Sequence, residues 1–104
     1  MAVVFLSHAA ASLIANEDEP LLGKDLYDFF EKLAPEKGSY EHNRIDDNAD
    51  AHLLSSLFKQ FYIFPIHDGK LMGEGGGTWQ ELMIAEFDGP RTRMIIVVVL
   101  GDKR

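Results

Sequence analysis

Residues 94–100 read Met-Ile-Ile-Val-Val-Val-Leu and form the longest apolar run of the chain. The run is much shorter than the stretch of about 20 residues that a membrane-spanning helix needs. Its β-branched residues favour a strand instead. Because the run is apolar on both faces, it predicts a strand at the centre of a sheet, covered by helices or by another subunit.

The segments before this run predict the rest of the sheet. Residues 78–87 and 92–100 read as two strands around the turn Asp88-Gly89-Pro90, and we expect them to pair as a hairpin. Patterning elsewhere predicts strands over residues 2–6, 10–15 and 61–66, a turn at 67–70 and a glycine-rich loop at 73–77.

Two helices are predicted between these strands. Helical spacing of apolar residues predicts the first from Pro20, with Asp18 or Glu19 as its cap, until Pro35 ends it. Residues 36–47 read as a surface loop, and a second helix follows over residues 49–59. The expected apolar side of that second helix consists of Leu53, Leu54, Leu57 and Phe58. Its expected polar side consists of His52, Ser55, Ser56 and Lys59.

This order of elements favours an α+β fold, a mainly antiparallel sheet packed with two helices. A chain of 104 residues suits one domain, which we expect to cover residues 1–104.

Composition limits the class of protein. Ten Lys and Arg against seventeen Asp and Glu give a net charge of -7, which disfavours nucleic acid and anionic membranes as partners. The chain has no cysteine, so any metal has to use histidine, carboxylate or carbonyl ligands. Residues 1–15 are apolar but lack the basic start of a secretory signal, so we expect a cytoplasmic protein without a membrane segment.

Residues 40–52 gather the groups best suited to chemistry. His42, His52 and four carboxylates lie within this segment, and such groups suit zinc, nickel or manganese. A second interpretation stays open, because acidic residues before a helix are usually solvated and favourable to its dipole. The ten-residue separation of the two histidines is not a known ligand spacing.

Other site patterns fail on single residues. The calcium-loop pattern that begins at Asp46 has Ala51 and Leu57 where glycine and a bidentate glutamate are needed. The glycine-rich segment 73–78 lacks the lysine of a phosphate-binding loop. The motifs of serine hydrolases and of zinc proteases are absent from the sequence.

Four blocks cover nearly the whole chain in a distinctive order: SHAAASLIANE at 7–17, HNRIDDNADAHLL at 42–54, GTWQ at 77–80 and EFDGPR at 86–91. Together they resemble the YjbQ-type family, known as secondary thiamine-phosphate synthases. The resemblance implies a compact α+β domain that assembles as a homotrimer, with a metal-holding site of histidine and acidic residues near the subunit contacts. It also implies weak joining of pyrimidine diphosphate and thiazole phosphate precursors into thiamine phosphate, with an unsettled physiological role.

The resemblance also assigns expected roles to residues. The expected ligands of a divalent ion are His8, His42 and His52. We expect Glu17 or Asp47 to act as a base or to orient a metal ligand. The expected contacts to a small phosphorylated substrate are the motif residues Asn16, Thr78, Trp79 and Gln80, to which we add Ser56 from the polar side of the second predicted helix. Glu86 is a further motif position, Lys59 and Arg93 are phosphate contacts on charge alone, and His67 is expected to be a turn residue.

Three departures from the family pattern support a second hypothesis. Family members usually begin about thirty residues earlier, with strands that complete the sheet, so an exposed sheet edge is expected here. Ala9 and Ala10 replace hydroxyl residues, and residues 73–76 lengthen a loop. The first hypothesis is therefore a metal-assisted transferase, and the alternative is a non-catalytic trimeric metal- or ligand-binding protein.

Overall fold

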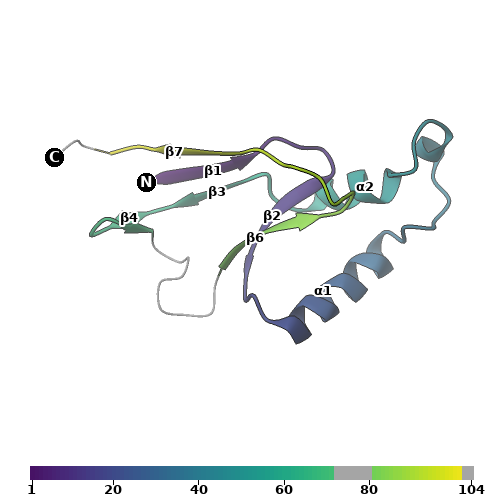
Figure 1. Cartoon of the computed structure of the whole chain (residues 1–104), viewed down its shortest axis with the longest axis horizontal. Coiled ribbons are helices and arrows are strands. Elements are labelled where there is room, and N and C mark those ends of the chain that lie inside the picture. Colours follow the sequence, from purple (N-terminus) through teal and green to yellow (C-terminus); the bar gives the residue numbers. More distant parts are fainter. Residues whose placement is uncertain (72–80, 102–104) are drawn as a thin grey trace.

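The computed structural model describes residues 1–71 and 81–101 (Figure 1). Strands open and close this part of the chain, and helices lie between them, so the predicted α+β fold is confirmed. In chain order the elements are β1 (Ala2–Leu6), β2 (Ala11–Asn16), α1 (Pro20–Leu33), the 3-10 turn η1 (Glu41–Arg44), α2 (Ala49–Leu57), β3 (Phe61–Phe64), β4 (Ile66–His67), β5 (Lys70–Leu71), β6 (Glu81–Glu86) and β7 (Ile95–Val99).

The strands form small antiparallel sheets. Among the described residues, β1 lies between β3 and β7, β2 pairs with β6, and β4 pairs with β5. An isolated bridge between Leu13 and Lys59 joins the β2 region to the segment that leads into β3. None of the helices in this part of the chain is long and apolar enough to cross a membrane.

The predicted hairpin of residues 78–87 with 92–100 is wrong. β6 pairs with β2, whereas β7 pairs with β1, so the two segments belong to different sheets. Tight hairpins use loops of about two to five residues. The longer connection over residues 87–94 carries the chain from one sheet to the other.

The predicted central position of the apolar run is also wrong. Among the described residues β7 is an edge strand, and its side chains are exposed on both faces, from 41% at Ile95 to 65% at Val99. β-Branched composition favours the strand conformation, but it does not decide which strands become its neighbours. Within the part of the chain that the structure describes, β7 is therefore an exposed edge of its sheet.

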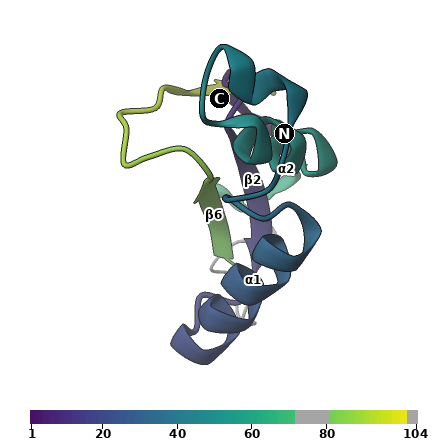
Figure 2. The same ribbon diagram turned by 90° about the vertical axis from the view of Figure 1, so that its right-hand side faces the viewer.

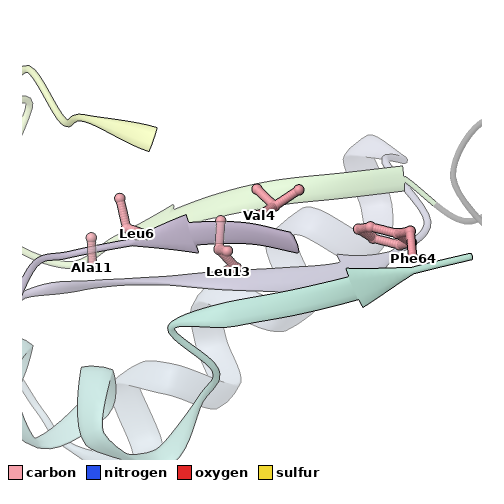
Figure 3. Close-up of a cluster of buried hydrophobic side chains, with 5 residues drawn as sticks. All are labelled: Val4, Leu6, Ala11, Leu13 and Phe64. Carbon is pink, nitrogen blue, oxygen red and sulfur yellow. The ribbon is translucent and has the colours of Figure 1, made fainter. Parts of the chain in front are cut away.

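A small apolar cluster lies where β1, β2 and β3 meet (Figure 3). Its buried members are Val4, Leu6, Ala11, Leu13 and Phe64. Tyr62 and Leu82 pack against the cluster and are partly buried. Burial alternates along β1, as expected for a strand with one face turned to a core, whereas Ala11, Ser12 and Leu13 of β2 are all buried.

The helix α2 (Ala49–Leu57) buries only part of its predicted apolar side: Leu54 is 4% exposed as expected, but Ser55 of the predicted polar side is buried with it. Leu53 and Leu57 are 49% and 64% exposed, whereas Ser55 is 4% exposed. The Ser55 hydroxyl donates to the Ala11 carbonyl at 2.9 Å, and the Ser12 hydroxyl donates to the Ser55 carbonyl at 3.0 Å. These hydrogen bonds satisfy a polar side chain that hydropathy alone assigns to the surface.

The first helix is confirmed with its predicted start. The Glu19 carboxylate accepts hydrogen bonds from the backbone N–H groups of Leu21 and Leu22, which caps α1. Phe30 of α1 contacts Phe58 and Phe87 with ring centroids 5.2 and 5.3 Å apart. In Figure 2, α1 lies across the ends of β2 and β6.

Substitution of Gly23 tests how much the helix propensity of α1 contributes to the stability of the fold. A Cβ added at Gly23 meets no atom within 4 Å. We expect Gly23→Ala to raise the free energy of unfolding by about 0.5–1 kcal/mol, because glycine loses more backbone entropy in a helix. Urea denaturation measures the change. The matched control is Gly69→Ala in the β4–β5 turn, where φ is 76° and the substitution should destabilise by about 1–2 kcal/mol. A destabilised Gly23→Ala variant would contradict the expectation.

Candidate functional site

His42 of η1 and His52 of α2 form a pair of imidazoles. Their ring centroids are 5.0 Å apart and the rings meet edge to face, at 87°. The Nδ1 atom of His52 lies 3.1 Å from the Ala9 carbonyl oxygen. Because a carbonyl oxygen only accepts, Nδ1 of His52 carries the proton and donates it. The neutral ring therefore keeps its lone pair on Nε2.

A hydrogen-bond chain orients His42 in the same way. The Asn48 amide nitrogen donates to the Asp88 carboxylate at 2.9 Å, which fixes the orientation of the Asn48 amide. The amide oxygen of Asn48 then faces Nε2 of His42 at 3.2 Å and accepts its proton. The neutral His42 ring keeps its lone pair on Nδ1. Each imidazole of the pair thus has one nitrogen held by the protein and one left for a ligand.

The third predicted ligand, His8, has different neighbours. Its Nδ1 lies 3.3 Å from Nη1 of Arg93, and its Nε2 lies 3.4 Å from the backbone nitrogen of Met94. Both neighbours are hydrogen-bond donors. His8 would therefore have to turn away from Arg93 before it could bind a metal ion.

Arg93 is held by a bidentate ion pair with Glu86. The Nε and Nη2 atoms of Arg93 lie 2.5 and 2.6 Å from the two oxygens of the Glu86 carboxylate. Hydrogen bonds from Arg93 hold the pKa of Glu86 below its usual value of 4.5, against the opposing effect of burial. The same carboxylate accepts from the Asp88 backbone N–H at 2.9 Å. Glu86 thus links His8, through Arg93, to the chain that orients His42.

His52 stands between two pockets. One is lined by His8, His52, Ser55, Ser56 and Gln60, among other residues. The other is lined by residues of the 39–42 segment together with Ala49, His52 and Leu53. Both pockets are open toward solvent, and His52 is the histidine that they share. A small ligand in either pocket would therefore meet this imidazole.

The predicted metal ligands are only partly brought together. His42 and His52 are adjacent, and His8 shares a pocket with His52 but faces Arg93. Within residues 1–71 and 81–101, no three histidine, aspartate or glutamate side chains are grouped closely enough to hold a metal ion. The residues of one chain fit a divalent ion only as a pair of nitrogen ligands with oriented rings.

The predicted carboxylates and substrate contacts are dispersed. Asn16 and Glu17 lie at the far end of β2 from the Ala9 carbonyl, about 20 Å away for an extended strand. Asp47 is exposed just before α2. Ser56 lines the pocket that contains His8 and His52, although its hydroxyl donates to the Leu53 carbonyl at 2.7 Å. The predicted contacts Thr78, Trp79 and Gln80 lie outside the described residues.

Some residues of the site escaped the sequence prediction. Asn48 is not among the predicted site residues, but its side chain orients His42 and makes no capping bond to α2. Asp88 was expected only in a turn, and Gln60 was not singled out, although it donates to the Ala11 carbonyl at 2.9 Å. Arg93 and Lys59, expected as phosphate contacts, lie against Glu86 and 4.8 Å over the Tyr62 ring. Asn48 and Asp88 lie inside the distinctive blocks 42–54 and 86–91, and this was the feature of the sequence that could have pointed to them.

These features define an α+β domain with paired, oriented imidazoles at the junction of two antiparallel sheets. The chain belongs to the family described as UPF0047 protein YjbQ-like, which its sequence matches over residues 1–102. A UPF0047 protein from Archaeoglobus fulgidus is 43% identical over 96% of this chain and 77% of its own length. The UPF0047 protein YjbQ of Escherichia coli O157:H7 is 33% identical over 95% of this chain and 72% of its own length.

Solved structures with the same fold support this assignment. The crystal structure of a hypothetical protein from Aeropyrum pernix K1 aligns with a TM-score of 0.89 at 36% identity, over 97% of this chain and 73% of that protein. A YbjQ-like protein of unknown function from Sulfolobus solfataricus P2 aligns with a TM-score of 0.82 at 36% identity. That alignment covers 92% of this chain and 67% of the Sulfolobus protein.

The ion pair of Glu86 with Arg93 predicts a pH-dependent stability. We expect Glu86→Gln to lower the free energy of unfolding at pH 7 by about 1.5–3 kcal/mol, the usual range for hydrogen bonds to charged groups. The pKa of Glu86 is lower in the folded protein than in the unfolded chain. Its contribution to the free energy of unfolding is therefore complete above pH 4.5 and is lost as the pH falls through the lowered pKa of the folded state. Urea denaturation of both proteins over this range measures the difference.

The control for this experiment is Glu41→Gln. Glu41 pairs with Arg44 at 3.2 Å, but both side chains are at least 80% exposed. An exposed pair of this kind contributes about 0–1 kcal/mol. A Glu86→Gln effect no larger than that of Glu41→Gln, or one that grows on acidification, would show that the Glu86–Arg93 pair does not stabilise the fold.

Proposed function

We propose that His42 and His52 form part of a divalent-metal site and that the protein uses this site to act on a phosphorylated small molecule. The observation that carries the proposal is the orientation of the two rings. Each ring donates one N–H to a fixed acceptor, Ala9 or Asn48, and this arrangement is typical of metal-binding histidines. His8, the other predicted ligand, lies in the same pocket as His52.

The reaction proposed is the joining of pyrimidine diphosphate and thiazole phosphate precursors into thiamine phosphate. The resemblance to the family implies this chemistry, and the net charge of -7 is consistent with a need for a cation. A bound zinc, nickel or manganese ion would stabilise the negative charge that develops on the diphosphate leaving group. Ser56 and Gln60, which line the His8–His52 pocket, supply neutral hydrogen-bonding groups for the substrate.

Assembly as a homotrimer would bring the dispersed residues closer to the site. Glu17 and Asn16 lie too far along β2 to reach the histidine pair of their own chain. In the proposed trimer a neighbouring chain supplies Glu17 as the base, or the exposed Asp47 takes this role. The exposed apolar strand β7 is the surface that we assign to these contacts. We place the assembly in the cytoplasm, as the sequence predicts.

A non-catalytic role in metal or ligand binding is the second candidate. It is favoured by the dispersal of the predicted catalytic carboxylates, because Glu17 follows the far end of β2 and Asp47 is an exposed residue before α2. Ala9 and Ala10 also supply no hydroxyl group there. The two candidates differ in one observable: a binding protein saturates with ligand but forms no product.

Metal analysis tests the proposal first. The protein, expressed without a histidine tag, should contain about one transition-metal ion per chain, and His42→Ala or His52→Ala should lose most of it. Elemental analysis after reconstitution with zinc, nickel and manganese makes the measurement. The matched control is His67→Ala, because His67 is an exposed histidine at the end of β4.

The result then separates the candidates. Equal metal content in the native protein and in both site variants would show that His42 and His52 do not bind the metal ion. Bound metal together with thiamine phosphate formation that His42→Ala abolishes would support the transferase. Bound metal without turnover above background would favour the binding protein.

Light scattering tests the assembly. We expect the mass of a homotrimer at low micromolar concentration. The double variant Val97→Lys, Val99→Lys should reduce that mass, because it places charge on the β7 surface. Val97 and Val99 are 58% and 65% exposed. The control is Leu21→Lys on α1, where the side chain is 74% exposed and no contact is assigned. A monomeric mass for the native protein would contradict the proposal.

A further inference from the structure

A separate cavity of about 390 Å³ is lined by residues of α1, β2 and β6, among others. It does not include the histidine pair. Its apolar wall contains Leu26, Phe30, Leu54, Met83 and Phe87. Its carboxylates are Glu31, Glu36, Asp50 and Glu86. Cavities of this size suit small molecules, since ligand pockets typically measure about 300–1,000 Å³.

Asp50 is the unusual member of this lining. The residue is only 8% exposed, and its carboxylate has no hydrogen-bond or ion-pair partner among the described residues. No fully buried side-chain oxygen in this part of the chain lacks a partner, so the Asp50 oxygens keep some accessible surface, and Asp50 lines the cavity. An ionised carboxylate removed from most of its water is costly unless a positive group pairs with it.

The other charged residues around the cavity also favour a positively charged ligand. No lysine or arginine of residues 1–71 or 81–101 lines the cavity. Arg93 balances Glu86 from outside, which leaves Glu31, Glu36 and Asp50 without a positive neighbour in the lining. The negative potential extends to Tyr40, whose pKa is raised by desolvation and then by the charges of Asp50 and Glu31.

We propose that this cavity binds a small organic cation, an ammonium group carried on an aromatic or aliphatic body. Asp50 pairs with the ammonium group, and Glu31 supplies further negative charge at the cavity wall. Phe30 and Phe87, whose ring centroids are 5.3 Å apart, contact the apolar body and add cation–π attraction. A bare inorganic cation would leave this apolar wall without a contact. The inference goes beyond the proposed function, because it needs neither the histidine pair nor a metal ion.

Benzylammonium is the probe, and benzyl alcohol and benzoate are its neutral and anionic controls. Titration at pH 7, followed by two-dimensional amide NMR, should show saturable binding of benzylammonium with shifts at α1, β6 and the start of α2. We expect the affinity for benzyl alcohol to be lower by at least about tenfold, since this molecule lacks the charge that pairs with Asp50. Equal affinity for benzylammonium and benzyl alcohol, or shifts confined to other surfaces, would overturn the proposal.

Variants assign the binding to Asp50. Asp50→Asn should weaken benzylammonium binding at least tenfold, a typical effect of removing one partner of a buried charge pair. The matched control is Asp25→Asn, an exposed carboxylate of α1 outside the cavity lining, which should leave the affinity within about twofold because exposed pairs contribute little. Unchanged binding in Asp50→Asn would overturn the proposal.

A second variant keeps the test decisive if Asp50→Asn does not fold. Gly23 lines the cavity, and a Cβ added there meets nothing within 4 Å. Gly23→Leu therefore places a side chain at the cavity from a helix position that tolerates it. We expect it to abolish benzylammonium binding without lowering the melting temperature, whereas retained binding would place the ligand elsewhere.

Discussion

The hydrogen bonds between α2 and the start of β2 decide where the candidate site forms. The Ser55 hydroxyl donates to the Ala11 carbonyl, and the Ser12 hydroxyl donates to the Ser55 carbonyl, in a region where all three residues are buried. These bonds hold Ser55 of α2 against the sheet, where Leu54 is buried beside it, while Leu53 and Leu57 stay exposed. His52 is thereby placed beside the Ala9 carbonyl, which fixes its ring.

The Glu86–Arg93 ion pair is the second constraint, and it connects segments that are distant in sequence. Arg93 reaches His8 in the β1–β2 connection, while Glu86 holds the backbone of Asp88, which orients Asn48 and through it His42. The loop between β6 and β7 therefore does more than join two strands. It carries polar contacts to both ends of the proposed metal site. The same carboxylate lines the cavity that we assign to an organic cation, so the two sites share one structural element.

Much of the fold follows from local patterns. The capped helix Pro20–Leu33 and the strands Ala2–Leu6 and Ala11–Asn16 lie within a residue or two of their predicted bounds. The turn at Asp68-Gly69 has positive φ at both residues, which that dipeptide tolerates well. Prediction failed where pairing was needed. A strand pattern in Ile95–Val99 gives the conformation but not the partner, so both the hairpin and the central position were wrong.

The sequence by itself determined the element types, the family blocks and the candidate residues His8, His42 and His52, because spacing, capping and side-chain chemistry are local properties. The tertiary structure alone decided which of these residues meet. His42 and His52 became a pair because Asn48, Asp88 and Ala9 supply acceptors at fixed positions. Packing also left the Asp50 carboxylate without a partner among the described residues, at a cavity whose wall is partly apolar. Such contacts depend on how distant segments pack and on which polar groups find partners, and neither is encoded by the periodicity of any single segment.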